Sequence, residues 1–390
     1  MKNREIVPDN MGIKPKLEKG MKPVKWDGTK WVEANPQIKG DWFDYSEGVN
    51  KWANVETENG YFVYIPRYSY KITSMYHQNG TSTTSGEILI DFIDTENKSL
   101  KNSTVYSTIE PTATVGGAMS DYVVHPAFVN NVENGGWDKE LEGIWVAKYE
   151  MSLFDKTTNA YVQTTTTELG NLVIDNSNNI NTDKIMKSWP NVSSWSNVDV
   201  TNIFTSCKEM NKTFGSHMMK NSEWGAVAYL AQSKYGKNQI EVAPNDSKWH
   251  ITGTGGVDAS TTGNEYGIYD MNSSAWEYVS AYMNSTNILA GGTNYSYNKS
   301  MVDEKELKYK QIYAENEYTA TNHKFGDALY ETSNNYRGWY EDWVYFDQSR
   351  GQSAVRGGLS DKVEVSGLFY IYDWDGKATT LASFRVVLAF

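Results

Sequence analysis

The sequence predicts an α+β fold that is built from short twisted strands, two main helices and long loops. Hydrophobic residues make up 39% and charged residues 22% of the 390 positions, which is typical of a folded soluble protein. Short apolar segments recur along the chain, whereas only two convincing stretches repeat apolar residues at helical spacing. Long polar runs separate these segments, and connections of such length in a compact domain usually carry function.

Charge and composition exclude several classes of ligand. The net charge of −12 repels phosphate backbones and anionic lipid, so we expect no nucleic-acid partner. No apolar run approaches the roughly 18 residues that span a bilayer, and the N-terminus MKNREIVPDN has no hydrophobic signal core. We therefore expect a protein that is made in a bacterial cytoplasm without a signal peptide and that does not insert into membranes. The single cysteine, Cys207, excludes an internal disulfide and a cysteine-rich metal cage.

Residues 1–55 are predicted to form a small N-terminal attachment or docking segment. Within it, MKPVKWDGTKWV (Met21 to Val32) predicts two short strands around Asp27-Gly28, a tight hairpin signal. So short a piece buries little surface by itself, and we expect it to dock on the main domain or on a neighbouring chain.

Strand patterns continue beyond this segment. GYFVYIPRYSYKI begins at Gly60, and its Pro66 predicts an edge position or a bulge. GEILIDFI, YVVHPAFV and GIWVAKYEMS follow as further apolar stretches. Residues 77–120, apart from GEILIDFI, and residues 157–196 are polar and predicted to be loop.

Two stretches predict helices. In VTNIFTSCKEMNKTFG the apolar residues recur at steps of three and four, and Gly215 supplies a stop. Cys207 would then face the core as a small hydrophobic residue, which we favour over a nucleophile because no neighbouring base is visible. In NSEWGAVAYLAQSKYG, Asn221 or Ser222 can cap the first turn and Gly236 ends the helix. Its expected buried stripe comprises Trp224, Val227, Ala228 and Ala231.

Three ordered blocks follow toward the C-terminus: TTGNEYGIYDMNSSAWEYVS (residues 261–280), AVRGG (354–358) and SFRVVL (383–388). Together they resemble the signature of the formylglycine-generating enzyme and sulfatase-modifying-factor family, a variant of the C-type lectin fold. The order Trp276-Glu277 reverses the usual Glu-Trp pair of that family. The resemblance implies one C-type lectin fold domain over residues 56–390, with an insert at about 283–350. The matching residues are Gly263, Asn264, Gly267, Asp270, Met271, Trp276, Glu277, Arg356, Gly357, Gly358, Phe384 and Arg385.

These motif residues have structural explanations of their own. The two glycines of the first block, Gly263 and Gly267, permit tight turns. Asp270 can accept backbone N–H bonds, and Arg356 or Arg385 can satisfy a buried carboxylate by a bidentate bond. We therefore assign these residues to the scaffold rather than to chemistry.

Membership in this fold does not imply the family's enzymatic activity. The oxidising members bind copper through a pair of cysteines, and this chain has one cysteine. The related iron-dependent members need a histidine cluster, whereas the histidines here are scattered without a close pair of metal-ligand spacing. We expect no metal, no other cofactor and no catalytic residues. The histidines are His77, His125, His217, His250 and His323.

A closer resemblance lies inside this superfamily. HMMKNSEWGAVAYLAQSKYG, VHPAFV, GIWVAKYE and KWANVETENGYFVYIPRYSYKI resemble variable proteins of diversity-generating retroelements in phages and prophages of Gram-positive gut-type bacteria. In those proteins the C-terminal strands display residues that adenine-directed mutagenesis alters. The resemblance implies that residues 356–390 form ligand-binding strands. The candidate contact residues are Leu359, Asp361, Val363, Val365, Tyr370, Tyr372, Asp373, Trp374, Thr379 and Leu381.

The genetic code limits which of these residues a retroelement can produce. Mutagenesis of AAC or AAT codons at adenine can yield Leu, Val, Asp, Tyr or Thr, but never Lys, Glu or Trp. Every candidate except Trp374 can therefore arise in this way. Trp374 and the neighbouring Lys362, Glu364 and Lys377 would be fixed by the template, which weakens the retroelement hypothesis without affecting the binding hypothesis.

Tyr370, Tyr372 and Trp374 alternate along a predicted strand and should lie on one face. An exposed aromatic row of this kind is typical of binding hot spots. The alternative is that the face packs against the insert, because aromatic strand faces are usually buried. Candidate partners there are Tyr336, Trp339, Tyr340, Trp343 and Tyr345.

We expect a non-enzymatic receptor-binding protein of a phage tail or cell surface, whose partner is a protein or glycan on a bacterial cell. The N-terminal segment would attach it to virion tail components or to sister chains. The rival hypothesis is a metal-dependent oxidoreductase or hydrolase of the same superfamily with an unrecognised site.

Overall fold

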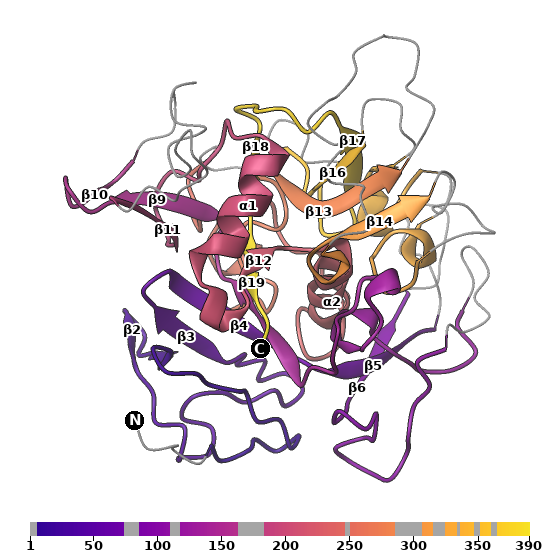
Figure 1. Ribbon diagram of the computed structural model, residues 1–390. Coiled ribbons are helices and arrows are strands. Elements are labelled where there is room, and N and C mark those ends of the chain that lie inside the picture. The colour runs from indigo at the N-terminus through magenta and orange to yellow at the C-terminus, as the bar shows by residue number, and fades with distance from the viewer. Residues whose placement is uncertain are drawn as a thin grey trace.

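In the part of the chain that the structure describes, three β-sheets combine with two α-helices (Figure 1). This computed structural model describes residues 6–73, 86–109, 118–162, 183–245, 250–284, 306–314, 324–333, 336–346, 352–359 and 365–390. Strands dominate this part of the chain, so the predicted α+β class with two main helices is confirmed.

The largest sheet joins both ends of the chain. Its main path runs in the order β10-β9-β11-β4-β3-β1-β2, and β8 connects β4 to β19, which in turn pairs with β12. The predicted hairpin around Asp27-Gly28 is confirmed as the β1–β2 pair. The strands of this sheet are β1 (Lys22–Trp26), β2 (Trp31–Glu33), β3 (Asn54–Thr57), β4 (Gly60–Pro66), β8 (Gly143–Ala147), β9 (Met151–Asp155), β10 (Ala160–Tyr161), β11 (Lys184–Ser188), β12 (His217–Met218) and β19 (Val386–Leu388).

The second sheet carries most of the C-terminal strands. It runs in the order β14-β13-β16-β17-β15, with β18 paired to β13. Its strands are β13 (Trp276–Asn284), β14 (Gln311–Ala314), β15 (Val344–Tyr345), β16 (Ser353–Arg356), β17 (Ile371–Trp374) and β18 (Ala382–Phe384). A third sheet comprises β5 (Tyr68–Ile72), β6 (Ile88–Phe92) and β7 (Val123–Val124).

The strand predicted from Gly60 onward is broken at Arg67. β4 ends at Pro66 in the large sheet, and β5 begins at Tyr68 in the third sheet. The Arg67 guanidinium is buried and donates to the Phe128 carbonyl at 2.6 Å. The proline thus marks the point where the chain changes sheet, which the sequence suggested only as an edge or a bulge.

Helix α1 (Val200–Met210) starts where the Asp199 carboxylate accepts a hydrogen bond from the Asn202 N–H at 2.9 Å. Gly215 has a left-handed φ of 58°, but it ends the short 3-10 helix that follows α1 rather than α1 itself. The 3-10 helices are η1 (Pro126–Phe128), η2 (Val132–Asn134), η4 (Lys212–Phe214), η5 (Val257–Ala259), η6 (Leu307–Tyr309), η7 (Tyr330–Thr332) and η8 (Trp339–Glu341).

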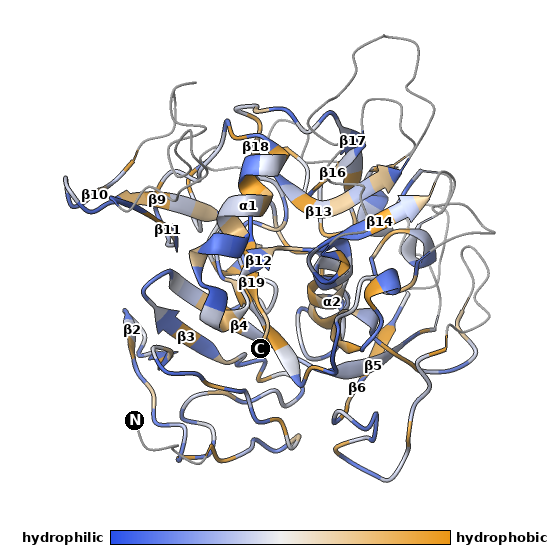
Figure 2. Cartoon of the chain, in the orientation of Figure 1, coloured by the Kyte–Doolittle hydropathy of each residue, from blue (hydrophilic) through white to orange (hydrophobic). Residues whose placement is uncertain are grey.

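Helix α2 (Asn221–Gln232) is the centre of the core, and all its residues are buried. The predicted single buried stripe is therefore too narrow, because the polar as well as the apolar residues of α2 (Figure 2) are buried. The expected caps at Asn221 and Ser222 are wrong, because Glu223 accepts the backbone N–H of Lys220 at 2.8 Å. The helix also ends at Gln232, before Gly236, and a contact between the Ser233 N–H and the Tyr229 carbonyl closes its last turn.

The N-terminal residues pack against the same core as the rest of the chain. Trp42, Tyr45 and Trp52 are fully or nearly fully buried. The Trp52 indole donates to the Tyr235 carbonyl at 2.8 Å, and the Tyr45 hydroxyl donates to the Tyr64 carbonyl at 2.7 Å. The division into residues 1–55 and 56–390 stays a prediction.

Cys207 lies on the buried side of α1, as its spacing predicts, and burial raises the pKa of its thiol well above the usual value. We expect a water-soluble disulfide reagent to leave the native protein unmodified and to label one thiol after denaturation in guanidinium. Labelling of the native protein as fast as of the unfolded chain would contradict this packing.

Candidate ligand-binding surface

The predicted aromatic residues of the last strands do share one face. The ring centroids of Tyr370 and Tyr372 are 6.3 Å apart, and those of Tyr372 and Trp374 are 6.4 Å apart. Ile371 and Asp373 alternate with them along β17 and point to the buried side. The predicted one-sided arrangement is therefore confirmed.

Neighbouring strands extend this row of rings. In the strand register, Tyr345 of β15 lies beside Tyr372, and Val355 of β16 lies on the other side of Tyr372. The Tyr345 and Tyr372 rings are 6.0 Å apart, and Tyr336 stacks on Tyr345 at 5.1 Å with an interplanar angle of 9°.

Trp276, the first residue of β13, also belongs to this row of rings. Its ring lies 6.1 Å from Tyr372 at an interplanar angle of 11°, and 4.9 Å from Trp374. The sequence motif marked Trp276 only as a scaffold residue, so this contact was missed. We call the set the aromatic ladder: Trp276, Tyr336, Tyr345, Tyr370, Tyr372 and Trp374.

The ladder has an exposed edge and a buried base. Tyr336 is 55% exposed, whereas Trp276 is 7% and Tyr370 is 4% exposed. Tyr372 and Trp374 are half-buried and pack partly against the core. The two predicted alternatives therefore both hold in part, because residues of the insert cover one side of the face and leave the other accessible.

Four predicted contact residues are not at the surface. Leu359 and Val365 are each 8% exposed, Tyr370 is 4% exposed and Asp373 is fully buried, so the expectation that they point outward is wrong. For Asp373 the reason is the strand alternation, which turns it away from Tyr372 and Trp374. 

The remaining candidates differ in position. Thr379 and Leu381 are half-buried and lie in the connection from β17 to β18. Asp361 and Val363 lie outside the described residues. The assignment of Tyr372, Trp374, Thr379 and Leu381 as ligand contacts stays a prediction.

The scaffold beneath this face is fixed by a buried ion pair. The Arg385 guanidinium donates to both Glu277 oxygens, at 3.0 Å through Nε and 2.7 Å through Nη2. Asp270 accepts the Gly253 N–H at 2.8 Å. The predicted bidentate bond and the predicted role of Asp270 are thus confirmed.

Arg356 behaves differently from Arg385. It is fully buried over the Trp224 ring, with its guanidinium carbon 5.4 Å from the ring centroid. Its Nη2 donates to the carbonyls of Ala328 at 3.2 Å and Leu368 at 3.1 Å. Arg356 therefore ties two loops to the sheet through backbone oxygens rather than through a bidentate carboxylate bond.

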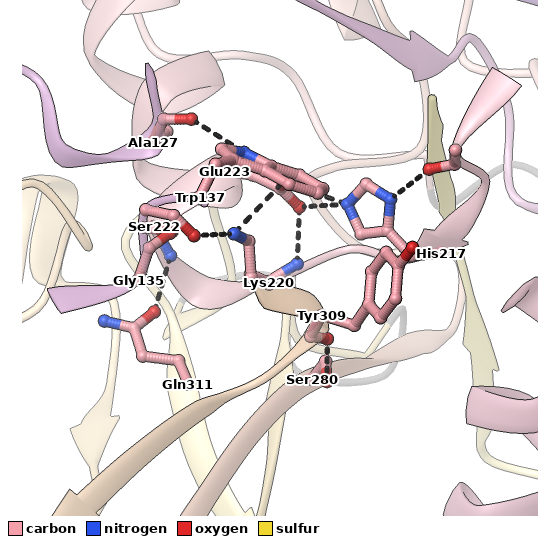
Figure 3. A network of polar contacts seen from close by, with 12 residues as sticks. Ala127, Gly135, Trp137, His217, Lys220, Ser222, Glu223, Ser280, Tyr309 and Gln311 are labelled. Carbon is pink, nitrogen blue, oxygen red and sulfur yellow. Dashed lines mark hydrogen bonds and ion pairs between the residues drawn. The ribbon is translucent and has the colours of Figure 1, made fainter. Parts of the chain in front are cut away.

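A second cluster of titratable groups surrounds the N-terminus of α2 (Figure 3). The His217 Nε2 atom is 2.9 Å from Glu223, and its Nδ1 atom is 2.8 Å from the Gly215 carbonyl. Both ring nitrogens therefore face acceptors, and although burial opposes it, the charges of His217 and Lys220 lower the pKa of Glu223.

Lys220 adds a second cation to this cluster. Its ammonium lies 3.7 Å from Glu223 and 4.1 Å from the centroid of the Trp137 ring. Burial lowers the pKa of Lys220 to about 8, although Glu223 opposes the shift. Because His217, Lys220 and Glu223 are all fully buried, this arrangement joins α2 to its neighbours and offers no surface to a substrate.

Within the described ranges, no group of three His, Cys, Asp or Glu residues is placed to hold a metal ion. His77 and His323 lie outside those ranges. His125 accepts the Ala127 N–H at 3.2 Å and burial lowers its pKa to about 3, so it is a neutral core residue.

Comparisons with known proteins identify no family for the chain. No family model and no curated protein matches it. Among solved structures it is similar to the Major Tropism Determinant I1 Variant, at 11% sequence identity and a TM-score of 0.31, over 96% of this chain and 85% of that chain. None of the helices in the described part is long and apolar enough to span a bilayer.

Proposed function

We propose that this chain is a non-enzymatic binding protein that uses the exposed edge of the aromatic ladder to contact a protein or glycan on a bacterial surface. The observation that carries the proposal is the half-buried pair Tyr372 and Trp374 on strand β17, which lies between β15 and β16. Many large aromatic side chains among the described residues are buried in the core, so a row of rings whose outer members, Tyr336, Tyr372 and Trp374, reach the surface calls for a functional explanation.

The geometry of the row suits recognition. Tyr and Trp present large contact areas while losing few rotamers, and they dominate binding hot spots. Tyr372 is held between the rings of Tyr345 and Trp276, and its strand pairs on both sides. Such preorganisation lowers the entropy that binding must overcome.

We further propose a C-type-lectin-like scaffold and a phage or prophage origin, with the C-terminal strands as a diversifiable surface. Sequence resemblance supports this part. Of the accessible residues, Tyr372, Thr379 and Leu381 can arise by adenine-directed mutagenesis, whereas Trp374 cannot. A reverse-transcriptase gene beside this gene, with a near-copy of its 3′ end mismatched chiefly at adenines, would support the retroelement. A neighbourhood without such a copy would reduce the proposal to an ordinary phage adhesin.

The binding proposal is tested with alanine variants on intact Gram-positive bacterial cells. We expect Tyr372→Ala and Trp374→Ala each to weaken cell binding at least about 30-fold, because a hot-spot residue contributes roughly 2 kcal/mol or more. Binding of fluorescently labelled protein is measured by flow cytometry over a concentration series, and near-UV circular dichroism confirms that each variant is folded.

Trp26→Ala is the matched control. Trp26 is another half-buried tryptophan, in the β1–β2 hairpin on the opposite side of the molecule from β17 (Figure 1). We expect this variant to bind like the unsubstituted protein. Equal loss of binding in all three variants would count against the proposal. So would the absence of binding of the unsubstituted protein to every Gram-positive strain tested.

A further inference from the structure

The segment that supplies the outer side of the aromatic ladder carries three buried acidic residues. Asp327 is fully buried, and Glu331 and Asp342 are 2% and 1% exposed. They lie within residues 324–333 and 336–346, which also provide Tyr336 and Tyr345 of the ladder. Buried carboxyl groups are costly to ionise unless cations and hydrogen-bond donors compensate them.

The buried carboxyl groups are only partly compensated by positive charge. The positive group that faces this cluster from the sheet is Arg356, and its Nη2 atom donates to the backbone carbonyls of Ala328 and Leu368. Its Nε and Nη1 atoms are buried without a hydrogen-bond partner. Within the described residues, the Arg356 guanidinium therefore acts as a charge on Asp327 and Asp342, although its hydrogen bonds go to neither carboxyl group.

Glu331 is surrounded mainly by neutral groups. Its Oε2 atom accepts the Gly326 N–H at 2.9 Å, whereas its Oε1 atom is buried without a partner of hydrogen-bond geometry. Tyr70 of β5 and Tyr229 of α2 face it, as does the carboxyl of Asp327. Burial is the main cause that raises the pKa of Glu331 to about 8.

The surroundings of Asp327 contain one strong donor. Asp327 accepts the Tyr313 hydroxyl of β14 at 2.8 Å and the Leu329 N–H at 3.1 Å. Arg356 and Lys324 act on it as charges. Burial nevertheless raises the pKa of Asp327 to about 6.

Asp342 lies at the contact between the ladder and the scaffold. Its Oδ2 atom accepts the Phe369 N–H at 2.8 Å, and its Oδ1 atom is buried without a partner. Glu241 and Glu341 face it with like charge, and Arg356 faces it with opposite charge. Burial, followed by Glu241, raises its pKa well above the usual value.

Backbone contacts connect this cluster directly to the ladder. The Gly338 N–H donates to the Asp342 carbonyl at 2.8 Å, and the Val344 N–H donates to the Tyr336 carbonyl at 3.0 Å. The Ile371 N–H, at the start of β17, donates to the Trp343 carbonyl at 2.9 Å. A change in the packing of Asp342 would therefore displace the residues on which Tyr336 and Tyr345 are mounted.

We propose that this acid cluster makes the aromatic ladder pH-sensitive: residues 324–333 and 336–346 hold its outer side firmly in mildly acidic solution and loosen as the solution is brought to neutral and slightly alkaline pH. The proposal rests on the proposed function only in treating the ladder as a binding surface. The predicted physical event is local opening of the segment, which occurs with or without a ligand.

The direction follows from proton linkage. A carboxyl group whose pKa is higher in the closed segment than in the opened one binds more protons when closed. Its stabilising contribution is complete below the ordinary carboxyl pKa and is lost as the pH rises through the closed-state value. For Glu331 this window extends from about 4.5 to about 8, and each pH unit within it favours opening about tenfold.

Hydrogen–deuterium exchange of the full chain tests this. Peptides within 324–333 are followed at pH 6 and pH 7, and their rates are divided by the intrinsic amide rates. We expect the opening constant to rise at least about tenfold per pH unit. In Glu331→Gln, which cannot ionise, the rise per pH unit should be about tenfold smaller than in the unsubstituted protein. Asp327→Asn is a second variant, compared with the unsubstituted protein between pH 5 and pH 6, where its slope should be smaller because burial raises the pKa of Asp327 to about 6.

Two controls make the result specific. Glu96→Gln removes an exposed carboxyl and should leave the pH dependence unchanged. Peptides of β8 should not follow the 324–333 peptides, because they report on the core rather than on the segment. An opening constant that is flat between pH 6 and pH 7, or an unaltered slope in both Glu331→Gln and Asp327→Asn, would overturn the proposal. Failure to bind bacterial cells would instead overturn the proposed function, since exchange is measured without a ligand.

Discussion

Replacing Arg385 by methionine is expected to lower the free energy of unfolding by about 3–5 kcal/mol, which is the usual cost of leaving one partner of a buried ion pair alone. Glu277 would lose both of its bonds to the guanidinium. Its neighbours Glu150 and Asp270 are also buried and acidic, so the remaining carboxylate would face like charges in place of the guanidinium. The effect is measured by urea denaturation at neutral pH.

The matched control removes an exposed cation. Lys22 lies 4.0 Å from Glu33, and both side chains are more than half exposed, at 53% and 61%. Lys22→Met should change stability by less than about 1 kcal/mol, because water and salt screen such a pair. The double variant Arg385→Met with Glu277→Leu should recover much of the loss. Equal stability of Arg385→Met and the unsubstituted protein would contradict the role of this ion pair in the scaffold.

Gly225→Ala is the second substitution with a large expected effect. A methyl group at this position of α2 would stand 2.0 Å from the Gly326 carbonyl oxygen, a backbone atom that no rotamer change can move. We expect a loss of about 3 kcal/mol, the upper range for overpacking, although alanine is otherwise the better helix former. Urea denaturation measures it, and exchange of the 324–333 peptides should accelerate.

Gly40→Ala separates the steric overlap from ordinary backbone strain. Gly40 has a φ of +73° and open space where a Cβ would stand. Its replacement should therefore cost only about 1–2 kcal/mol, through backbone strain. If Gly225→Ala is no less stable than Gly40→Ala, α2 and residues 324–333 are not packed as closely as the steric overlap at Gly225 requires.

Local sequence patterns predicted the elements better than their ends. The helical spacing of α1 and α2 was sufficient to place both helices. The ends of the helices depend on contacts that local spacing does not indicate. At the start of α2, Glu223 accepts the backbone N–H of Lys220 and also contacts the His217 ring and the Lys220 ammonium. Likewise, Pro66 signalled an interruption, but only the burial of Arg67 between two sheets explains it.

The candidate surface was predicted in part for the same reason. Strand alternation placed Tyr372 and Trp374 together, and it also places Asp373 inside once β17 has neighbours on both sides. The stacking of Trp276 on Tyr372 joins residues almost a hundred positions apart through the strand between them. No local pattern indicates such a contact, since it depends on the order of strands in the sheet.

The two faces of the sheet that contains β13, β16 and β17 have different roles. On its inner side, Glu277 and Arg356 connect β13 and β16 to the core. On its outer side, Tyr372 and Trp374 remain accessible. The inner contacts determine stability, so substitutions at the exposed edge should alter recognition while the fold is retained.

Hydroxyl-radical footprinting with and without intact Gram-positive cells tests the proposed surface most directly. We expect oxidation of Tyr372 and Trp374 to fall when cells of a bound strain are present, while oxidation of Trp26 stays the same. Unchanged labelling of Tyr372 and Trp374 in the cell-bound protein, with protection elsewhere, would contradict the proposed binding surface.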